Sequence, residues 1–181
     1  VATWLVRGAG RGPPFVVGPS AFALEGTLEV GRTEVIGLLQ EVVRQANKRP
    51  CFERVSVVGH LDLAVPPIVA DPGQLRGVFS NIIVNAAESM PDGGQLTLSG
   101  GLSDGGGAGW VTVSDTGCGI AEEDLGKLFQ PFFTTKEIGK GTGLGLAIAY
   151  GIVKMHRGTL EIQSRLGQGS SFTVTLPVDG P

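Results

Sequence analysis

The sequence predicts an α+β fold, a two-layer α/β sandwich in which about three helices cover one mixed, mostly antiparallel sheet. Two observations carry this prediction. Segments with helical spacing of apolar residues are interspersed with segments that alternate apolar and polar residues. Several of the alternating segments follow one another through hairpin-type turns, which join antiparallel neighbours. A doubly wound parallel sheet is therefore not expected.

Residues 1–30 differ from the rest of the chain. Glycine and proline interrupt every periodic segment there before it reaches helix length. Two short apolar pieces, 4–6 and 15–17, fit edge strands or the end of a neighbouring domain equally well. We expect residues 1–30 to be a tail or the remnant of a neighbouring segment, and residues 31–178 to form the main domain.

The first half of that domain predicts two helices separated by a strand. Apolar residues recur at helical spacing over 33–47, with Thr33 placed to cap the start. A strand is expected over 55–61. Asp71 then suits an N-cap, because proline follows at the first helical position and Gln74 occupies the capping-box position. This second helix is expected to end near Met90.

The second half predicts strands, then helices, then a closing hairpin. Alternating strands are expected over 95–99 and 110–114, followed by a short helix over 121–128. A helix over 144–156 is expected to end with Gly158 as the C′ residue. The segments 159–164 and 171–176 alternate cleanly and predict a final hairpin.

The composition is that of a folded domain. The chain has 181 residues, of which 41% are hydrophobic and 17% charged, and these values exclude a disordered polyampholyte. The formal net charge of −3 argues against a broad basic surface for nucleic acid or anionic lipid. No apolar run reaches the roughly 18 residues of a membrane span, and no signal peptide is legible. We expect a cytoplasmic location.

The counts of cysteine and histidine exclude several kinds of site. Cys51 and Cys118 are the only cysteines, and His60 and His156 are the only histidines. These numbers are too small for a disulfide framework, a structural zinc site or a multi-histidine metal centre. The 30 glycines follow no collagen period, so we expect them in turns and loops.

Three polar side chains share one face of the helix that begins after Asp71. Asn81 and Asn85 are four residues apart, and Glu88 lies three further on. Asparagine is a poor residue for a helix interior, and such local conflicts favour functional positions. The amide oxygen of Asn85 suits Mg²⁺, a hard cation that keeps water and phosphate oxygens as its other ligands. An exposed helix face with two solvated amides explains this segment equally well.

A strand ends in Asp115, which is followed by glycine at 117 and 119. The carboxylate can accept a hydrogen bond from an exocyclic amine, and the glycines let the chain approach a flat ring. A common strand-end turn explains the same residues. The Asp-Thr-Gly triplet also occurs in aspartic proteases, but those need two, and this chain contains one.

Glycines open the helix over 144–156 and follow a segment rich in aromatics. Closely spaced glycines at a helix N-terminus expose N–H groups to an anion. The pattern is neither Gly-x-Gly-x-x-Gly nor a P-loop. Upstream, residues 128–136 hold three phenylalanines, and the small, polar residues 137–142 are typical of a mobile lid. Lys136 and Lys140 are placed to reach a phosphate.

Together and in this order, these segments resemble the catalytic, ATP-binding domain of bacterial sensor histidine kinases. The matching motifs are Asn81-Ile-Ile-Val-Asn85-Ala-Ala (N box), Asp115-Thr-Gly-Cys-Gly119 (G1 box), Pro131-Phe-Phe-Thr-Thr-Lys136 (F box), Gly141-Thr-Gly-Leu-Gly-Leu146 (G2 box) and Gly167-Gln-Gly-Ser-Ser-Phe172 (closing turn). The resemblance covers about Thr33 to Pro177 and is strongest to the nitrogen-regulation type. It implies the Bergerat ATP-binding fold, shared with gyrase, the Hsp90 chaperones and MutL.

The resemblance also implies a role for each matching residue. Asp115 would bind the adenine amino group, Asn85 would coordinate Mg²⁺, and Asn81 would lie beside the phosphates. Ser170 would support the adenine through water, and residues 134–142 would form the ATP lid. The residues expected around ATP are Asp115, Gly117, Gly119, Thr134, Thr135, Lys136, Lys140, Gly141, Thr142, Gly143, Leu144, Gly145 and Ser170.

Asn81 stands where the gyrase-like ATPases carry a glutamate that activates water. An amide cannot take a proton, so efficient ATP hydrolysis is not expected and the γ-phosphate is spared for transfer. In the family the acceptor is a histidine in a separate dimeric helical domain, and neither His60 nor His156 has that context. We therefore expect a largely monomeric catalytic domain that acts on an acceptor domain, with a response regulator downstream. The alternatives are an anti-sigma-type serine kinase and a non-catalytic ATP sensor of the same fold.

Overall fold

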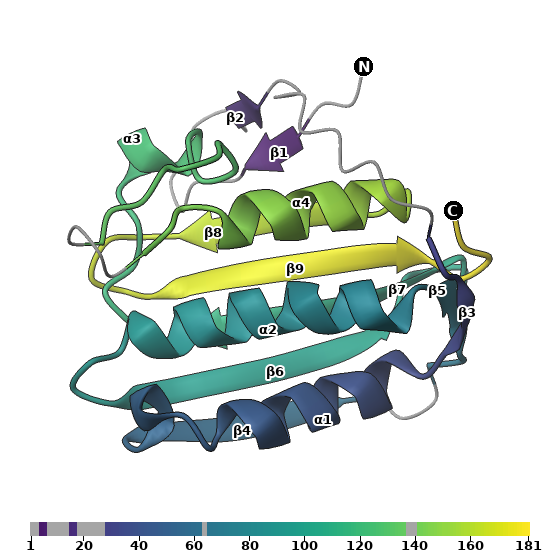
Figure 1. The fold of residues 1–181 in the computed structure, drawn as a ribbon, viewed down its shortest axis with the longest axis horizontal. Coiled ribbons are helices and arrows are strands. Elements are labelled where there is room, and N and C mark those ends of the chain that lie inside the picture. The colour runs from purple at the N-terminus through teal and green to yellow at the C-terminus, as the bar shows by residue number, and fades with distance from the viewer. Residues whose placement is uncertain (1–3, 7–14, 18–27, 63–64, 137–140) are drawn as a thin grey trace.

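A five-stranded mixed sheet forms one layer of the protein (Figure 1). The computed structural model describes residues 4–6, 15–17, 28–62, 65–136 and 141–181. In spatial order the strands are β4 (Val55–Leu61), β6 (Gly94–Leu102), β7 (Ala108–Asp115), β9 (Ser170–Pro177) and β8 (Thr159–Ser164). β4 and β6 are parallel, and the other three neighbouring pairs are antiparallel. The predicted mixed, mostly antiparallel sheet is confirmed.

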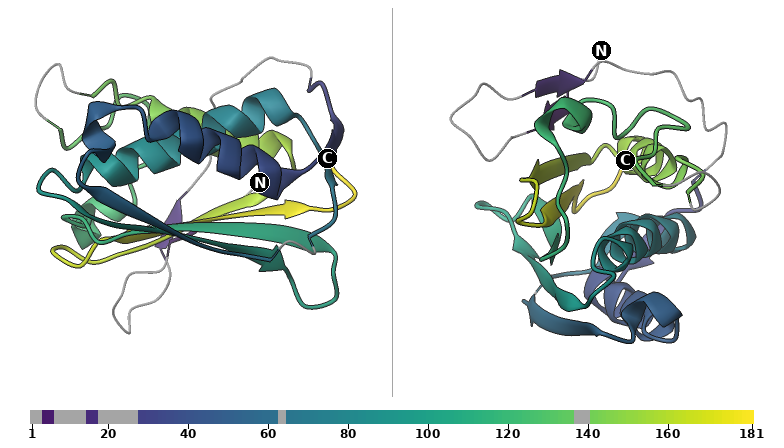
Figure 2. Two further views of the ribbon diagram at one scale, coloured as in Figure 1. Left: turned by 90° about the horizontal axis from the view of Figure 1, so that it is seen from below. Right: turned by 90° about the vertical axis from the view of Figure 1, so that its left-hand side faces the viewer.

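Three helices form the second layer and cover the same face of the sheet (Figure 2). They are α1 (Val35–Ala46), α2 (Pro72–Glu88) and α4 (Gly145–Met155). α2 lies between the other two and contacts both. A 3-10 turn, η1 (Pro50–Phe52), follows α1, and the short α3 (Glu122–Leu125) follows β7. Among the described residues, no helix is long and apolar enough to cross a membrane.

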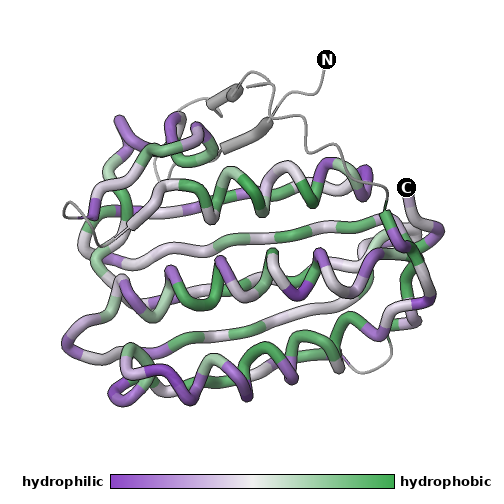
Figure 3. Tube along the Cα trace, viewed as in Figure 1, coloured by the Kyte–Doolittle hydropathy of each residue, from purple (hydrophilic) through white to green (hydrophobic). Residues whose placement is uncertain are grey.

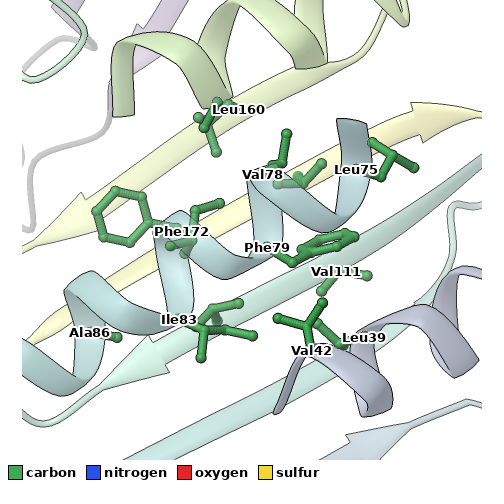
Figure 4. Close-up of a cluster of buried hydrophobic side chains, with 14 of the residues drawn as sticks. Leu39, Val42, Leu75, Val78, Phe79, Ile83, Ala86, Val111, Leu160 and Phe172 are labelled. Atoms are coloured by element: carbon green, nitrogen blue, oxygen red, sulfur yellow. The ribbon is translucent and has the colours of Figure 1, made fainter. Parts of the chain in front are cut away.

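The core fills the space between the helices and the sheet, with α2 at its centre (Figure 4). Five α2 side chains are fully buried: Leu75, Val78, Phe79, Ile82 and Ile83. Apolar and polar residues alternate along the strands, as their hydropathy colours show (Figure 3). Phe172 therefore faces the helices, while hydroxyl side chains pair on the neighbouring positions, such as Thr112 with Thr173 at 2.8 Å. The period-2 pattern thus determines which sheet face packs against the helices.

Two smaller ladders flank the main sheet. β1 (Trp4–Val6) pairs antiparallel with β2 (Phe15–Val17), so both short apolar pieces of the first 30 residues are strands. β3 (Gly31–Thr33) pairs antiparallel with β5 (Ile68–Ala70). These ladders use segments that are too short to be recognised from periodicity alone.

The expected N-cap of α1 at Thr33 is wrong. Thr33 belongs to β3, and its Oγ1 donates to the carbonyl oxygen of Ala70 at 3.0 Å. Glu34 precedes α1 instead, without a capping hydrogen bond from its side chain. The hydroxyl of Thr33 is used across the β3–β5 ladder, a contact between residues 37 positions apart that local sequence does not reveal.

The predicted start of α2 is confirmed. Asp71 is the N-cap, Pro72 is the first helical residue, and Asp71 Oδ1 accepts from the Gln74 amide at 3.0 Å. Asp71 Oδ2 accepts from the Glu29 amide. Burial by itself raises the pKa of Asp71, but these backbone hydrogen bonds outweigh it, and the pKa is lowered.

His156 fastens the end of α4 to the start of α2. It is 1% exposed, and its Nε2 accepts from the Asp71 amide at 2.9 Å. Its Nδ1 lies 2.8 Å from the carbonyl oxygen of Ile152. Because Nε2 accepts, the ring proton is assigned to Nδ1, which donates to Ile152. Both ring nitrogens are therefore used inside the fold.

Two helix ends differ from the prediction. Arg157, with φ of 54°, is the C′ residue of α4, and Gly158 follows it. The Gly158 amide donates to Val153 and the Arg157 amide to Lys154, as in a Schellman motif. Glycine is needed at 158 because a Cβ there would lie 2.5 Å from the backbone carbonyl oxygen of Thr175. α3 is shorter than the expected 121–128, because hydrogen bonds three residues apart replace the helix after Leu125.

We predict that His156→Ala lowers the free energy of unfolding by about 2–4 kcal/mol. The substitution removes a buried ring and leaves the Asp71 amide without its acceptor. Urea unfolding followed by circular dichroism measures the change. His60→Ala is the matched control, since His60 is exposed on β4, and it should change stability by less than about 0.5 kcal/mol. Equal stability of the two variants would contradict this role of His156.

Candidate functional site

Asp115 is a buried carboxylate at the end of β7. It is 6% exposed, and its Oδ1 accepts three hydrogen bonds. The donors are the Gly117 amide at 2.9 Å, the Ser89 hydroxyl at 3.1 Å and the Ser170 amide at 3.3 Å. Burial raises the pKa of Asp115 above its ordinary value, and these donors only partly counteract that rise. All three described bonds use Oδ1, so Oδ2 accepts none of them.

The loop after Asp115 is held between the end of α2 and the β8–β9 turn. The Cys118 amide donates to the Ser89 carbonyl oxygen at 3.0 Å, and the Gly167 amide donates to the Cys118 carbonyl oxygen at 2.7 Å. The Ile120 amide donates to Ser164 Oγ at 2.9 Å. The loop is thus fixed on both sides by backbone and hydroxyl groups.

Packing within the protein explains both glycines of this loop. A Cβ on Gly117 would lie 2.6 Å from the Ser89 carbonyl oxygen. Gly119 has φ of 67°, and a Cβ there would lie 2.7 Å from the Arg165 carbonyl carbon. The sequence pattern predicts that these glycines allow a flat ring to approach. The structure shows that they are already needed for the approach of α2 and of the β8–β9 turn.

Ser170 and Ser164 form a buried pair of hydroxyl groups next to Asp115. Their Oγ atoms are 2.9 Å apart, and each residue is 6% exposed. Ser170 reaches Asp115 through its backbone amide, while its hydroxyl is engaged by Ser164. Ser89 and Ser164 were not among the expected site residues. No local signal marks them, because a serine at a helix end or in a strand is common.

The polar face of α2 carries Asn81, Asn85 and Glu88, as the helical spacing predicts. Asn81 Nδ2 donates to the Gly145 carbonyl oxygen at 3.1 Å and so joins α2 to the first residue of α4. Asn85 Oδ1 accepts from Lys136 Nζ at 3.1 Å. Lys136 also forms an ion pair with Glu88. Asn85 Oδ1 thus already contacts a positively charged group, and a neutral amide oxygen is a suitable ligand for a hard metal ion.

The aromatic segment before Lys136 packs against the glycines that precede α4. The Phe132 amide donates to the Gly143 carbonyl oxygen at 3.0 Å, and Gly143 has φ of 66°. A Cβ on Gly143 would lie 2.7 Å from the Phe133 carbonyl oxygen. Phe132 itself has φ of 67° and is 72% exposed. The glycine at 143 is thus required by this close crossing of two chain segments.

The remaining expected residues lie around the same crossing. Thr134 Oγ1 accepts from the Lys136 amide at 3.2 Å, and a Cβ on Gly141 would lie 2.9 Å from that oxygen. Thr142 Oγ1 lies 3.4 Å from the Leu144 amide, and Thr135 is exposed. Lys140 lies outside the described residues, as do residues 137–139 of the expected lid.

α4 begins with amides that no side chain caps. Leu144 is the N-cap residue, and its carbonyl oxygen accepts the first helical bond, from the Ile148 amide. The N–H groups of the first turn therefore have no acceptor within the helix. Because Asn81 of α2 touches Gly145, this helix terminus lies beside the polar face of α2. An anion next to Asn85 would contact both the N–H groups at the start of α4 and the polar face of α2.

The described residues fit a metal that keeps most of its ligands as water or phosphate. Within the described ranges, no group of three or more His, Cys, Asp or Glu side chains could hold a metal ion. Mg²⁺ commonly uses one or two protein oxygens together with substrate phosphates. Asn85 supplies one such oxygen. A small apolar cavity lies near the start of β7, away from the polar face of α2. Val35, Phe79 and Trp110 are among its lining residues, and none of the lining residues is charged.

Comparisons of sequence relate the chain to kinases. Residues 70–180 match the family described as histidine kinase-, DNA gyrase B- and HSP90-like ATPases. The chain is 37% identical over 144 residues to sporulation kinase E of Bacillus subtilis (strain 168), covering 80% of this chain and 19% of that protein. It is 39% identical over 141 residues to the sensor histidine kinase ZraS of Escherichia coli (strain K12), covering 78% and 29%. The chain thus spans less than a third of either relative.

Comparisons of structure agree. The crystal structure of full-length ShkA in complex with AMPPNP has a TM-score of 0.75 and 28% identity, covering 86% of this chain and 32% of that one. The nucleotide-free catalytic domain of the histidine kinase ThkA has a TM-score of 0.73 and 27% identity, covering 84% and 99%. The predicted fold, that of histidine kinase catalytic domains, is confirmed.

We predict that Gly119→Ala destabilises the protein by about 2 kcal/mol or more. A side chain there meets the Arg165 backbone and must adopt a positive φ. Thermal unfolding measures the loss. Gly126→Ala is the matched control, because Gly126 has φ of −69° and a Cβ would meet nothing within 4 Å. A Gly119 variant as stable as the Gly126 variant would show that the loop is not constrained as described.

Proposed function

Because the chain belongs to the family of histidine kinase-, DNA gyrase B- and HSP90-like ATPases, we propose that it binds ATP with Mg²⁺ and donates the γ-phosphoryl group to a histidine on a separate dimerisation and phosphoacceptor domain. Residues 31–178 form the ATP-binding domain in this proposal. The observation that carries it is the buried Asp115 carboxylate, whose three described hydrogen bonds all fall on Oδ1.

Asp115 binds the adenine in this proposal. Its Oδ2 accepts a hydrogen bond from the exocyclic amino group, and the surrounding desolvation makes that bond strong and selective. Gly117 and Gly119 keep the neighbouring backbone free of side chains, and Ser170 holds the carboxylate through its amide. A nucleobase that lacks this exocyclic amino group supplies no hydrogen-bond donor to the Asp115 carboxylate.

The phosphates lie between the polar face of α2 and the N-terminus of α4. The amides of Gly145 and the residues after it face the negative charge, and Gly141, Gly143 and the intervening backbone border the same space. Asn85 holds Mg²⁺, which neutralises phosphate charge when bound. Thr134, Thr135, Lys136, Lys140, Thr142 and Leu144 complete the proposed ATP contacts.

Catalysis then depends on positioning and charge neutralisation. Asn81 carries an amide where a water-activating base would be needed, and that amide donates to the Gly145 carbonyl oxygen. No proton acceptor for water is thereby supplied at this position, so hydrolysis is slow and the γ-phosphoryl group is kept for transfer. Effective transfer requires the acceptor histidine to be aligned with the γ-phosphate.

The acceptor is a residue of another domain. His156 is buried with both ring nitrogens engaged, so it is closed to a phosphoryl group. His60 is exposed on β4, an edge strand on the far side of β6 from β7 and Asp115. The relatives named sensor histidine kinases are much longer than this chain. A helical acceptor domain and a downstream response regulator are accordingly the proposed partners.

We predict transfer of the γ-phosphoryl group to a supplied acceptor domain. The chain is mixed with the isolated dimerisation domain of ZraS and γ-labelled ATP, and acid-labile, base-stable label is measured on that domain. Label is expected on the acceptor domain and absent when its histidine is replaced. Label on serine, or tight ATP binding with transfer to no acceptor domain tested, would contradict the proposal.

We predict that Asp115→Asn weakens ATP binding at least about tenfold. The substitution replaces a charged acceptor, whose hydrogen bonds are worth about 1.5–3 kcal/mol, with a neutral one. Titration calorimetry with ATP and Mg²⁺ measures the change. Asp104→Asn is the matched control, because Asp104 is exposed in the β6–β7 turn, and it should bind like the wild type.

The pH dependence provides a second test of the same contact. The adenine amino group needs the ionised carboxylate, and the pKa of Asp115 is raised above 3.8 by burial. Wild-type affinity should therefore fall as pH decreases, beginning at a higher pH than for an exposed aspartate. Asp115→Asn should lack this component of the pH profile. Identical profiles for both proteins would place the nucleotide elsewhere.

A further inference from the structure

Lys136 places a positive charge on the oxygen that Mg²⁺ would use. Its Nζ donates to Asn85 Oδ1 at 3.1 Å and at the same time forms an ion pair with Glu88. Asn85 and Glu88 are three residues apart, so they lie on one face of α2 and together hold the ammonium group. The contact joins the end of the aromatic segment to the last turn of α2 across 48 residues of sequence.

The ammonium group and Mg²⁺ are rivals for this oxygen. A hard cation at Asn85 would sit within about 2.1 Å of Oδ1, and two cations at such a distance from one oxygen repel strongly. Lys136 must therefore leave Asn85 when the metal enters. If Lys136 turns to the phosphates, its ammonium group neutralises phosphate charge, but its ion pair with Glu88 is lost. Glu88 thus favours the arrangement without nucleotide.

We propose that Glu88 retains Lys136 on Asn85 in the nucleotide-free protein and thereby sets the affinity for Mg²⁺ and ATP. This inference rests on the proposed function, because it takes Asn85 as the magnesium ligand. Glu88 acts through Lys136 as a positioning residue. Its carboxylate has no other assigned role in the site.

The strength of the contact suits a reversible competitor. The side chains of Lys136 and Glu88 are 35% and 38% exposed, so water screens the pair. Exposed ion pairs contribute about 0.2–1 kcal/mol, which corresponds to a factor of up to about five in an equilibrium constant. An ion pair of this strength lowers the affinity for Mg²⁺ and ATP measurably, and Mg²⁺ with a triphosphate still displaces it.

The test is the affinity for ATP at fixed Mg²⁺ in Glu88→Gln, measured by titration calorimetry. We expect binding about two- to fivefold tighter than in the wild type, and half-maximal ATP binding at a lower Mg²⁺ concentration. Glu41→Gln is the matched control, because Glu41 is also a half-exposed partner of an ion pair, with Arg76 on the side of α2 that faces α1. It should leave ATP affinity unchanged.

A double-mutant cycle separates the competing contact from simple charge repulsion. In a Lys136→Met background there is no ammonium group to retain, so Glu88→Gln should no longer tighten binding. The same gain in both backgrounds would show that Glu88 only repels the phosphates and would overturn the inference. Unchanged or weaker binding in Glu88→Gln would also overturn it. Wild-type protein that binds no ATP would instead refute the proposed function itself.

Discussion

The arrangement of the site depends on burying one carboxylate, that of Asp115. An ionised group costs several kcal/mol to remove from water unless hydrogen bonds replace its hydration. Here the replacement donors come from three segments: Ser89 at the end of α2, Gly117 in the following loop and Ser170 at the start of β9. These segments can meet at one oxygen only if their backbones approach closely. The glycines of the region are consequences of that approach.

Gly169 illustrates the same constraint from the other side. It has φ of 85°, and a Cβ there would lie 2.8 Å from the Asp115 carbonyl carbon. The β8–β9 turn is therefore pressed directly against the end of β7. The sequence pattern relates Gly117 and Gly119 to a ligand, but contacts within the protein already require glycine at both positions. The result is a rigid, preorganised carboxylate, which is the proposed acceptor for the adenine.

α2 connects stability to function. Its apolar face forms the centre of the core, and its N-cap is tied through the Asp71 amide to His156, the C-cap residue of α4. Its opposite, polar face carries Asn81, Asn85 and Glu88, and the two asparagines cost helix propensity. The buried face offsets that cost. Because α2 is held at its beginning by His156 and at its end by Ser89, the polar side chains keep their positions relative to Asp115 and α4.

Much of this protein is determined by the sequence itself. Period-2 and helical patterns predict the five strands of the main sheet and the three covering helices, and Asp71-Pro-Gly-Gln74 predicts the start of α2, because these signals arise from contacts within a few residues. The ordered motifs likewise place the candidate site on α2, on the loop after β7 and at the start of α4.

Predictions from local sequence were wrong where a residue distant in sequence determines the conformation. Thr33 bonds to Ala70 instead of capping α1, and Arg157 takes the left-handed position expected of Gly158. Only the tertiary structure joins His156 to the Asp71 amide, Ser89 to Asp115, and Lys136 to Asn85 and Glu88, because groups that are 26 to 85 residues apart in sequence meet only when the sheet and helices are packed.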